Sequence, residues 1–466
     1  MKLNQLIDQA PEIEICGLTD DSRQVKPGFL FVSTTENDYT ESAVQNGAAA
    51  IVVPLDYSRT LPVPVIKTAH PGKTLARAAA KFYGAMPEHI AGVTGTNGKT
   101  SIVDFVRQIL TMMTYKAASM GTLGYIKGNE EPVPAPNTTV NQVSLHRELA
   151  ELAKDGYNYV AMEASSHGLC QYRVGGVRFD TAGFTNLTRD HLDYHKTMEN
   201  YLAAKLILFT EQLKEGGTAV LNADIDVFAQ IKQACLDSGK KVAAYGYNGD
   251  VIKLLKAVPL THGQKLNLEF YGKSYEIEIP LAGTFQAMNV LCALGLAAEL
   301  TGKPEEVIQY AAKIHGAKGR MELAGIKNGA AVYIDYAHTP DALENVIKAL
   351  RPHTRGRLRV LFGCGGDRDA GKRPIMGRLA NDLADVAYVT DDNPRTEDAV
   401  QIRSQIMAAC PKGRNIGDRA AAIRTAMAEL EPGDVLILAG KGHETGQYIN
   451  GAVHHFSDHE EVAKNL

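Results

Sequence analysis

Short apolar runs alternate along the chain with longer stretches in which apolar residues recur with the period of a helix. Residues 141–154 are one such stretch, and their apolar side chains fall mainly on one side, which predicts an amphipathic helix. The short runs are rich in β-branched residues and predict strands at 50–53, 90–93, 159–162, 332–334, 359–362, 386–390 and 435–438. Strands that alternate with helices in this way predict an α/β protein with mostly parallel sheets.

Chain length and two breaks in this pattern predict three domains. A chain of 466 residues is long enough for roughly two to four domains. One break lies near residues 86–88, directly before a strand and a glycine-rich loop, and the other lies near residues 316–319, after the predicted helix 304–314. We therefore expect α/β domains at 1–87, 88–318 and 319–466.

The composition narrows the class of protein. With 49 Lys and Arg against 53 Asp and Glu, the formal net charge is −4, which argues against a dedicated nucleic-acid binder. The six cysteines lie far apart and form no C-x-x-C pair, so we interpret them as free thiols in a reducing compartment. The N-terminus lacks the apolar core of a signal peptide, and no window approaches about 18 consecutive apolar residues. We expect a soluble cytoplasmic protein with no membrane span.

A glycine-rich loop, Thr94-Gly95-Thr96-Asn97-Gly98-Lys99-Thr100-Ser101, follows the predicted strand 90–93 and leads into an apolar helix. Strand, loop and helix in this order are the context that a phosphate-binding loop requires. The glycines allow backbone N–H groups to approach phosphates, Lys99 adds a positive charge, and the Thr100 hydroxyl can ligate Mg²⁺. Val93 stands where the strict pattern has its first glycine, so a plain strand–helix turn is the alternative; the lysine–threonine pair favours phosphate binding.

Polar clusters directly follow three predicted strands of the last domain, at residues 363–369, 392–395 and 440–444. Since the carboxyl ends of parallel strands line the ligand crevice of an open sheet, these side chains are expected to converge. Arginines and carboxylates in one crevice suit a zwitterionic amino acid, and the residues concerned are Arg368, Asp392, Asn393, Arg395 and Glu444. The alternative is charged loop ends in solvent, and recurrence at three strand ends favours a site.

The loop sequence TGTNGKT at 94–100 resembles the ATP loop of the Mur ligase family, which makes the peptide stem of bacterial cell-wall precursors, and of its folylpolyglutamate synthetase relatives. Further matches span nearly the whole chain: LTDDSR at 18–23, EASSHGLCQYRV at 163–174, DYAHTPD at 335–341, GCGGDRD at 363–369, DNPR at 392–395 and GKGHE at 440–444. They resemble the branch of the family that forms a UDP-N-acetylmuramoyl tripeptide. The resemblance implies a small UDP-binding domain, a central P-loop-type ATPase domain and a Rossmann-like C-terminal domain.

The resemblance also implies roles for individual residues. Those expected to bind ATP are Gly95, Thr96, Asn97, Gly98, Lys99, Thr100, Ser101, Asn289, Arg320, Asp335 and His338. Those expected to bind the UDP-linked substrate are Ser22, Asn137, Thr138, Thr139, Ser165, Gln171 and Arg173. Those expected to bind the amino acid are Arg368, Asp392, Asn393, Pro394, Arg395, Gly440 and Glu444. Two departures accompany these matches: segment 33–42 lacks the family's usual longer loop, and Gln286 stands where relatives usually have Asn.

Mg²⁺ is the cofactor expected beside the phosphates. Thr100, Glu163 and His191 offer a hydroxyl, a carboxylate and an imidazole; the alternative is that the last two are buried polar residues that satisfy loop backbone. His191 and His195 are four residues apart, but Leu192 stands where a zinc protease needs Glu, so that class is rejected.

Lys205 lies in an apolar helical stretch, and composition alone favours a surface lysine whose stem packs on apolar neighbours. Several Mur ligases carry a carbamylated lysine at a similar distance from the EASSHG motif. The resemblance therefore implies that Lys205 is carbamylated and positions a second Mg²⁺. The catalytic residues that it implies are Lys99, Glu163, His191 and Lys205.

The activity implied by the resemblance is ATP-dependent amide formation. ATP would phosphorylate the D-glutamyl γ-carboxylate of UDP-MurNAc-L-Ala-D-Glu, and the amine of a diamino acid would displace the phosphate. Arg395 in DNPR resembles the members that add meso-2,6-diaminopimelate, since an arginine without a carboxylate partner disfavours lysine. Addition of L-lysine, a ligase with another acceptor such as folylpolyglutamate synthetase, and a nucleotide-binding regulatory protein are the alternatives. We expect small-molecule partners, no nucleic acid, and a monomer.

Overall fold

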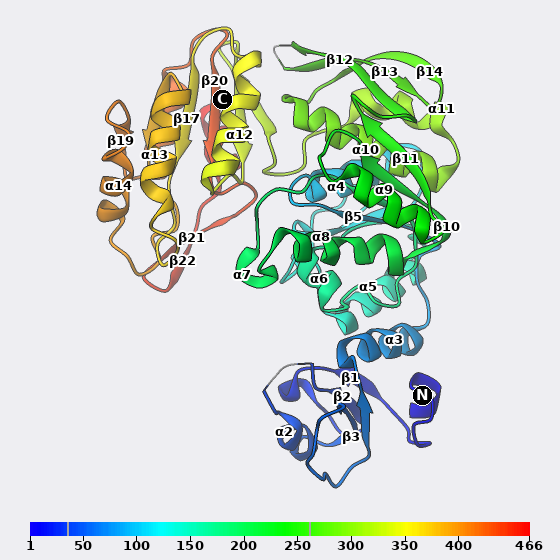
Figure 1. The fold of residues 1–466 in the computed structure, drawn as a ribbon. Coiled ribbons are helices and arrows are strands. Elements are labelled where there is room, and N and C mark those ends of the chain that lie inside the picture. The colour runs from blue at the N-terminus through cyan, green and yellow to red at the C-terminus, as the bar shows by residue number, and fades with distance from the viewer. Residues whose placement is uncertain (35–36, 261) are drawn as a thin grey trace. The chain divides into compact units, whose positions relative to one another are not determined.

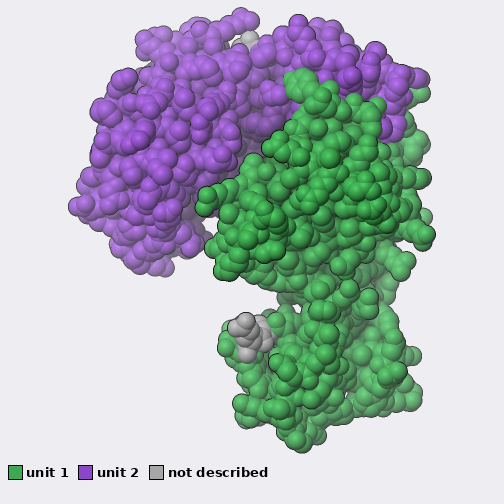
Figure 2. All heavy atoms as spheres, viewed as in Figure 1, with its two compact units in different colours: residues 1–250, 292–307 green, residues 251–291, 308–466 purple. Residues whose placement is uncertain are grey.

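The computed structural model describes residues 1–34, 37–260 and 262–466, which form two compact units (Figure 2). Unit 1 comprises residues 1–250 and 292–307, and unit 2 comprises residues 251–291 and 308–466. Both units are built from strands and helices that alternate along the chain, so the predicted α/β class is confirmed. The two predicted boundaries, which divide the chain into three domains, stay a prediction. Within the described ranges, no helix has the length and apolar character needed to cross a membrane.

A four-stranded parallel sheet opens unit 1. Its strands, in spatial order, are β1 (Gly17–Thr19), β2 (Phe29–Val32), β3 (Ala48–Pro54) and β4 (Val65–Thr68). Around it lie α1 (Leu3–Leu6), the 3₁₀ turn η1 (Ser22–Gln24), α2 (Thr40–Gln45) and α3 (Pro71–Tyr83). Helix α3 begins at Pro71, whose fixed φ suits the first helical position. Its buried side chains Leu75 and Ala79 share one apolar core with Leu30 and Val52 of the sheet.

The second sheet of unit 1 has the phosphate-loop strand at its centre. Its spatial order is β11 (Lys241–Gly246), β10 (Leu213–Asn222), β9 (Phe179–Phe184), β5 (His89–Thr94), β8 (Tyr159–Glu163), β6 (Ala117–Gly121) and β7 (Gly124–Lys127). Only β7 is antiparallel to its neighbour. Accompanying helices are α4 (Lys99–Met112), α5 (Gln142–Lys154), α6 (Ser166–Cys170), α7 (Leu192–His195), α8 (Met198–Ile207), the π-helical η2 (Leu208–Gln212) and α9 (Phe228–Asp237). Strands β5, β8 and β9 are almost wholly buried, which explains their near-continuous apolar sequence.

Unit 2 contains an antiparallel meander and a mainly parallel sheet. The meander is β12 (Ile252–Leu260), β13 (Gly263–Phe270) and β14 (Lys273–Ile279). The parallel sheet has the order β15 (Glu322–Lys327), β16 (Ala330–Asp335), β20 (Val435–Ala439), β17 (Leu358–Phe362), β18 (Val386–Val389) and β19 (Arg414–Asn415), with β15 antiparallel to β16. The hairpin β21 (Gly446–Ile449) and β22 (Ala452–His455) follows β20.

Helices cover both faces of the parallel sheet. On one face lie α12 (Pro340–Leu350), α13 (Lys372–Leu383) and α14 (Ala399–Met407), which Figure 1 labels. On the other face lie α15 (Arg419–Ala428) and α16 (Asp458–Asn465), and the 3₁₀ turn η4 (Arg351–His353) directly follows α12. Successive residues of β20 alternate between the two cores, with Ile437 in the first and Leu436 and Leu438 in the second. Two covered faces require a strand that is apolar throughout, as β20 is.

The predicted elements match the observed ones, apart from their ends. Every predicted strand coincides with an observed strand to within a few residues, and helix α5 replaces the predicted 141–154 with Asn141 as its cap. The cap is direct, because Asn141 Oδ1 accepts the Ser144 N–H over 2.9 Å. The predicted helix 304–314 is wrong in form: it divides into α11 (Pro304–Val307) and the 3₁₀ segment η3 (Ile308–Lys313). Helix α10 (Thr284–Thr301) precedes it and crosses from unit 2 into unit 1.

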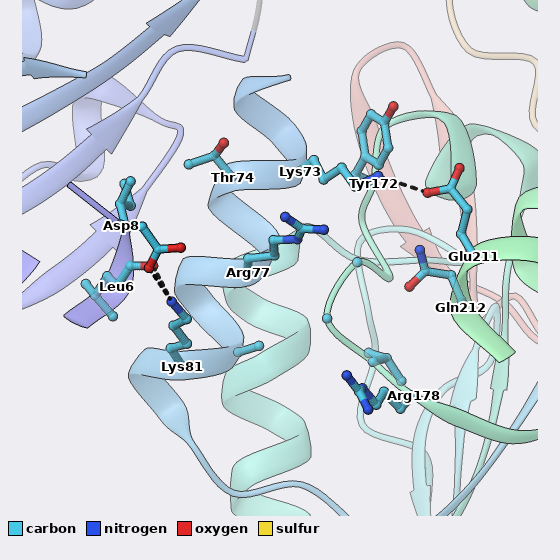
Figure 3. Close-up of a pocket in the computed structure, with 15 residues that line it drawn as sticks. Leu6, Asp8, Lys73, Thr74, Arg77, Lys81, Tyr172, Arg178, Glu211 and Gln212 are labelled. Atoms are coloured by element: carbon cyan, nitrogen blue, oxygen red, sulfur yellow. Dashed lines mark hydrogen bonds and ion pairs between the residues drawn. The ribbon is translucent and has the colours of Figure 1, made fainter. Parts of the chain in front are cut away.

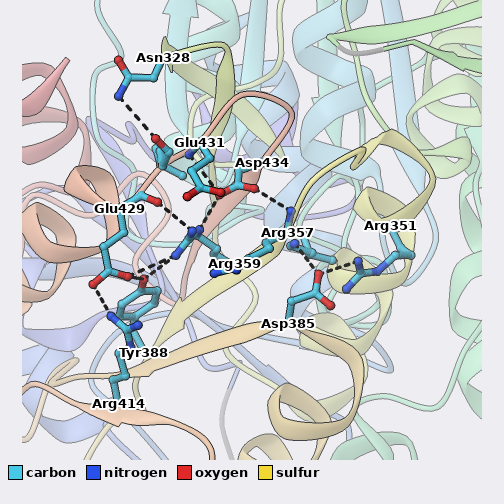
Figure 4. Close-up of polar contacts among 12 residues, drawn as sticks. Asn328, Arg351, Arg357, Arg359, Asp385, Tyr388, Arg414, Glu429, Glu431 and Asp434 are labelled. Carbon is cyan, nitrogen blue, oxygen red and sulfur yellow. Dashed lines mark hydrogen bonds and ion pairs between the residues drawn. The ribbon is translucent and has the colours of Figure 1, made fainter.

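A buried ionic network closes the end of the parallel sheet where β17 and β20 begin (Figure 4). Arg359 is 2% exposed, and its Nε donates to Asp434 Oδ2 over 2.8 Å. Its other nitrogens donate to Tyr388 Oη over 3.1 Å and to Glu429 O over 2.8 Å. Burial acts to raise the pKa of Asp434, but hydrogen bonds from the Arg357 N–H and from Arg359 outweigh it and hold the pKa below the usual aspartate value.

We predict that Asp434→Asn lowers the free energy of unfolding by about 1.5–3 kcal/mol, because the buried Arg359 loses the carboxylate 2.8 Å from its Nε and keeps the one of Glu429, 3.3 Å from its Nη1. Urea unfolding measures the loss, and Asp382→Asn, an exposed change on α13, is the matched control. Since the pKa of Asp434 is lowered by folding, its contribution is complete above about pH 4 and is lost as the pH falls through the lowered value. Equal stabilities of the two variants would contradict this account.

Candidate active site

The glycine-rich loop joins the end of β5 to the first turn of α4, as the sequence predicts. Gly95 has a φ of +139°, and it has no room for a Cβ because one would overlap the Thr185 hydroxyl. That hydroxyl donates to Asn97 O over 2.6 Å, and the Asn97 N–H donates to Asn186 Oδ1 over 2.9 Å. Residues just after β9 therefore hold the loop in shape. The loop and the start of α4 offer N–H groups that suit phosphate oxygens.

Two lysines converge on one carbonyl of this loop. Lys99 Nζ donates to Gly95 O over 2.9 Å and to Thr96 O over 2.7 Å, and Lys205 Nζ donates to the same Gly95 O over 2.8 Å. Lys205 is 1% exposed and lies over the ring of Tyr201, so the surface position favoured by composition is wrong. Burial, and after it the positive charge of Lys99, lowers the pKa of Lys205 well below its ordinary value.

Glu163 ends β8 as a buried carboxylate whose hydrogen-bond donors are neutral. Its Oε1 accepts the Thr122 N–H over 2.7 Å, and its Oε2 accepts the Thr122 hydroxyl over 3.3 Å. Thr100 lies in the first turn of α4 and is also buried. His191 is exposed and stands 3.4 Å from Asp190, so the alternative of a buried histidine is wrong. In the part of the chain that the structure describes, no group of three or more His, Cys, Asp or Glu side chains is placed to hold a metal; the predicted set has only two.

Four residues predicted to bind the UDP-linked substrate form one hydrogen-bonded group. Arg173 donates from Nη1 to Thr139 O over 2.7 Å and from Nη2 to Gln171 Oε1 over 2.7 Å. The Ser165 N–H donates to Thr139 Oγ1 over 3.0 Å, and that hydroxyl donates to Glu163 O, also over 3.0 Å. The group is thereby tied to the end of β8.

The remaining substrate-side predictions lie around this group. Thr138 exchanges a 3.0 Å hydrogen bond with the Thr122 hydroxyl, and Asn137 lines a small cavity with Thr138 and Glu163. Ser22 lies apart, at the start of η1 beside the first sheet. The predicted shortening of segment 33–42 falls partly on residues 35–36, which lie outside the described residues.

The nucleotide-side residues of unit 2 also form a connected set. Asn289 Nδ2 donates to Gln286 Oε1 over 3.0 Å, and Gln286 Nε2 donates to Arg320 O over 3.1 Å. The Arg320 guanidinium stacks over Tyr336, 4.8 Å from the ring centre. Gln286, singled out only as a departure from the family pattern, thus joins the two predicted residues Asn289 and Arg320.

Asp335 ends β16 and fixes the turn beside Arg320. Its carboxylate accepts the N–H of Met321 over 2.6 Å and that of Ala337 over 2.7 Å. Burial raises the pKa of Asp335, while the charge of Arg320 and these two hydrogen bonds oppose the rise. His338 lies three residues further on, and burial lowers its pKa.

The polar clusters that follow the strands of unit 2 meet in one cavity of about 710 Å³. Six of the seven residues predicted to bind the amino acid line it: Arg368, Asp392, Asn393, Arg395, Gly440 and Glu444. Pro394 instead lies behind it, with its carbonyl packed so closely on Gly366 that no Cβ would fit there. A cavity of this size lies within the usual range for small-molecule sites.

Arg395 is held in an unusual conformation at the edge of this cavity. Its φ is +53°, which a non-glycine residue rarely adopts, and its Nη1 donates to Gly366 O over 2.9 Å. Asn393 Nδ2 donates to Glu444 Oε2 over 3.1 Å, which joins the second and third clusters. A guanidinium and carboxylates that face one cavity are suited to the carboxylate and ammonium groups of an amino acid.

Comparisons with known proteins agree with this arrangement. The family model of the Mur ligase middle domain matches residues 93–297, and that of the Mur ligase glutamate ligase domain matches residues 319–442. The UDP-N-acetylmuramoyl-L-alanyl-D-glutamate–2,6-diaminopimelate ligase of Bradyrhizobium diazoefficiens is 47% identical, with 100% of this chain and 99% of the relative covered. The ligase of the same name from Agrobacterium fabrum is 48% identical, with 99% and 95% covered.

The chain belongs to the Mur ligase family. A solved structure of a UDP-N-acetylmuramoyl-L-alanyl-D-glutamate–2,6-diaminopimelate ligase is 32% identical, with a TM-score of 0.75 over 100% of this chain and 98% of that one. The family resemblance drawn from TGTNGKT and the later motifs is therefore confirmed.

One buried lysine beside the cavity of unit 2 was not among the predicted site residues. Lys441, the lysine of the GKGHE motif, has 0% exposure. Its Nζ donates to Asn393 Oδ1 over 3.2 Å, to Glu444 Oε2 over 3.3 Å and to Gly446 O over 2.7 Å. A lysine directly after a buried strand and between two glycines was the available signal. It holds the second and third clusters together from behind the cavity.

The contacts of strand β21 were also not predicted, because they join residues far apart in the chain. The Arg395 N–H donates to Tyr448 O over 2.9 Å, and the Asn450 N–H donates to Arg395 O over 2.7 Å. Gln447 Nε2 also donates to Asp392 O over 2.6 Å. Both backbone groups of Arg395 are thus fixed by a hairpin about 50 residues later in the chain, which explains how its positive φ is maintained.

We predict that Lys441→Met loosens this assembly, because a methionine of similar length cannot donate to Asn393, Glu444 or Gly446. The free energy of unfolding should fall by about 1–3 kcal/mol, and the amides of residues 446–449 should exchange faster with solvent. Urea unfolding and amide hydrogen exchange measure the two effects. Lys412→Met, an exposed change on a loop of the same unit, should leave both unchanged. Unaltered exchange at 446–449 in Lys441→Met would count against the role of Lys441.

Proposed function

We propose that the chain is an ATP-dependent ligase that adds meso-2,6-diaminopimelate to the D-glutamyl γ-carboxylate of UDP-MurNAc-L-Ala-D-Glu. The observation that carries the proposal is the cavity in which Arg395 faces Asp392 and Glu444. A diamino acid with a carboxylate at each end offers a partner to every one of these charges. The names of relatives that are 47–48% identical over nearly the full chain support the same reaction.

The phosphate loop supplies the first step. The γ-phosphoryl group of ATP is transferred to the γ-carboxylate of D-glutamate, which gives an acyl-phosphate and ADP. Lys99 and the N–H groups at the start of α4 neutralise and orient the phosphates, while Arg173, Gln171 and Ser165 bind the UDP-linked substrate. The neutral amine of the diamino acid then attacks the acyl carbon, phosphate leaves, and the amine loses a proton as the amide forms.

Mg²⁺ fits the donors beside the loop. Glu163 is a buried carboxylate with only neutral hydrogen-bond donors, which suits an oxygen-binding cation, and the Thr100 hydroxyl and His191 complete the proposed set. When bound, Mg²⁺ neutralises charge on the phosphate oxygens. We also propose that the reaction takes place in the cytoplasm and that the enzyme is a monomer.

Lys205 is the proposed site of carbamylation. Only a neutral amine attacks CO₂, and burial beside Lys99 lowers the pKa of Lys205 in the direction that supplies one. The new N–C bond forms as the nitrogen loses a proton, and the product is a carbamate anion that can position a second Mg²⁺. In bicarbonate buffer, native mass spectrometry of the protein should show the mass of one added CO₂, which acid removes. Lys205→Arg should lack it, and an identical mass in both proteins would contradict the modification.

Phosphate release in the presence of ATP, Mg²⁺ and UDP-MurNAc-L-Ala-D-Glu tests the function. We expect release that requires meso-2,6-diaminopimelate, together with the matching tripeptide product by mass. Equal turnover with L-lysine would refute the amino-acid assignment but retain the ligase. No release with either amino acid, despite nucleotide binding, would favour the regulatory alternative or another acceptor.

Arg395→Ala should lower kcat/KM for meso-2,6-diaminopimelate by about 10- to 150-fold, because a charge-assisted pair with the distal carboxylate is lost. The KM for ATP should stay the same. Arg378→Ala removes an exposed arginine from α13 of the same unit and serves as the control. A matching loss of activity in both variants, or none in Arg395→Ala, would refute the role of Arg395.

A further inference from the structure

A second large cavity lies in unit 1, and its lining residues are not among those assigned above to a substrate. Its volume is about 670 Å³, and its walls are the chain after α1, the outer face of α3, residues 175–178 and the end of η2 (Figure 3). Its lining residues lie in helices and loops that flank the two sheets of the unit, so a molecule bound there would touch α3, η2 and the chain after α1.

The walls of the cavity carry more positive than negative charge. Two lysines are paired: Lys73 Nζ lies 3.0 Å from Glu211, and Lys81 Nζ lies 3.7 Å from Asp8. Two arginines, Arg77 and Arg178, line the same space and have no hydrogen bond or ion pair with any described residue. With Asp8 and Glu211 as its acidic members, the lining has a net charge of plus two.

Three positive side chains follow one another along one face of α3, and their mutual repulsion destabilises the helix. Lys73, Arg77 and Lys81 are spaced four residues apart, so they share one face of the helix, and like charges at this spacing are mutually destabilising. Figure 3 shows the Arg77 side chain extending from α3 into the cavity, with Gln212 and Arg178 on the opposite wall. A bound anion would turn this repulsion into attraction.

We propose that this cavity binds a phosphate ester of about the size of a nucleoside monophosphate. A dianionic phosphate matches the net charge of the lining, and two unpaired guanidinium groups bind phosphate oxygens in the geometry that arginine favours. The volume is far larger than a lone phosphate needs and lies in the range of small-molecule sites. Tyr172 adds an aromatic surface at the wall, and Lys73 Nζ lies 5.5 Å from its ring centre.

The cavity is joined to the substrate side through Tyr172. This residue lies between Gln171 and Arg173, which hold each other and Thr139 by hydrogen bonds. A ligand on Lys73 and Tyr172 therefore lies next in the chain to two residues that the proposed function assigns to the UDP-linked substrate. Binding of the phosphate ester does not depend on that assignment.

Calorimetric titration of the full chain, with its nucleotide site filled by ADP and Mg²⁺, tests the binding. The probes are ribose 5-phosphate, ribose and GMP. We expect ribose 5-phosphate to bind, ribose not to bind, and the Kd to rise at least about tenfold in the double variant Arg77→Gln/Arg178→Gln. The double variant Arg147→Ala/Lys154→Ala removes two cations from the exposed side of α5 and should leave the Kd unchanged.

The three probes separate the sources of the ligand. Tighter binding of GMP than of ribose 5-phosphate identifies a nucleotide, and equal binding identifies the sugar phosphate; both outcomes support the site if the arginine variant weakens them. Absence of binding, or the same Kd in the arginine variant as in the wild type, would overturn it. No turnover is measured, so failure of this site and failure of the ligase activity are told apart.

Discussion

The close contact between Gly95 and the residues that follow β9 is the constraint on which the active centre of unit 1 depends. A Cβ at Gly95 would overlap the Thr185 hydroxyl, and that hydroxyl is itself occupied by Asn97 O. Position 95 must therefore be glycine for the loop to approach the end of β9, where the Thr96 and Asn97 N–H groups donate to Asn186 O and Asn186 Oδ1. Glu163 lies beside the start of the loop because β8 pairs with β5, which places Glu163 opposite Val93. Lys205 lies beside the loop because its Nζ donates to Gly95 O.

The two ends of the strands in the parallel sheet of unit 2 differ: a buried ion pair lies where the strands begin, and a cavity lies where they end. Where β17 and β20 begin, Arg359 and Asp434 form a buried, hydrogen-bonded pair. Where the strands end, the side chains of Asn393, Arg395 and Glu444 face a cavity of about 710 Å³. The paired charges of Arg359 and Asp434 fix the strands where they begin. The charges of Arg395 and Glu444, where the strands end, line a cavity that a ligand can enter. This is the expected location of a ligand in an open α/β sheet.

The sequence could predict what depends on local pattern. Strands such as β5 and β20 are apolar runs, α5 is an amphipathic stretch with a capping asparagine, and the polar clusters come directly after strands. The contact of Gln286 with Arg320 and the contacts of Lys441 and β21 could not be predicted from local pattern, because they join residues far apart in the chain. Lys441 binds Asn393, which lies 48 residues earlier, and no periodicity reports such a contact. The prediction of one helix over 304–314 was wrong for a different reason: apolar spacing alone does not separate an α-helix from a 3₁₀ segment.

Lys99 and Lys205 both donate to Gly95 O, and burial beside Lys99 favours the neutral form of Lys205. Two ammonium groups that share one acceptor repel each other, and the repulsion is strongest where water is excluded, as it is around Lys205. Loss of the proton from Lys205 removes the repulsion, and addition of CO₂ to the neutral amine would reverse its sign. A carbamate beside Lys99 would then attract it, and would provide oxygen ligands next to a loop built for phosphate. Burial is costly for a lysine with only a structural role, and at Lys205 it favours the neutral amine that the proposed carbamylation requires.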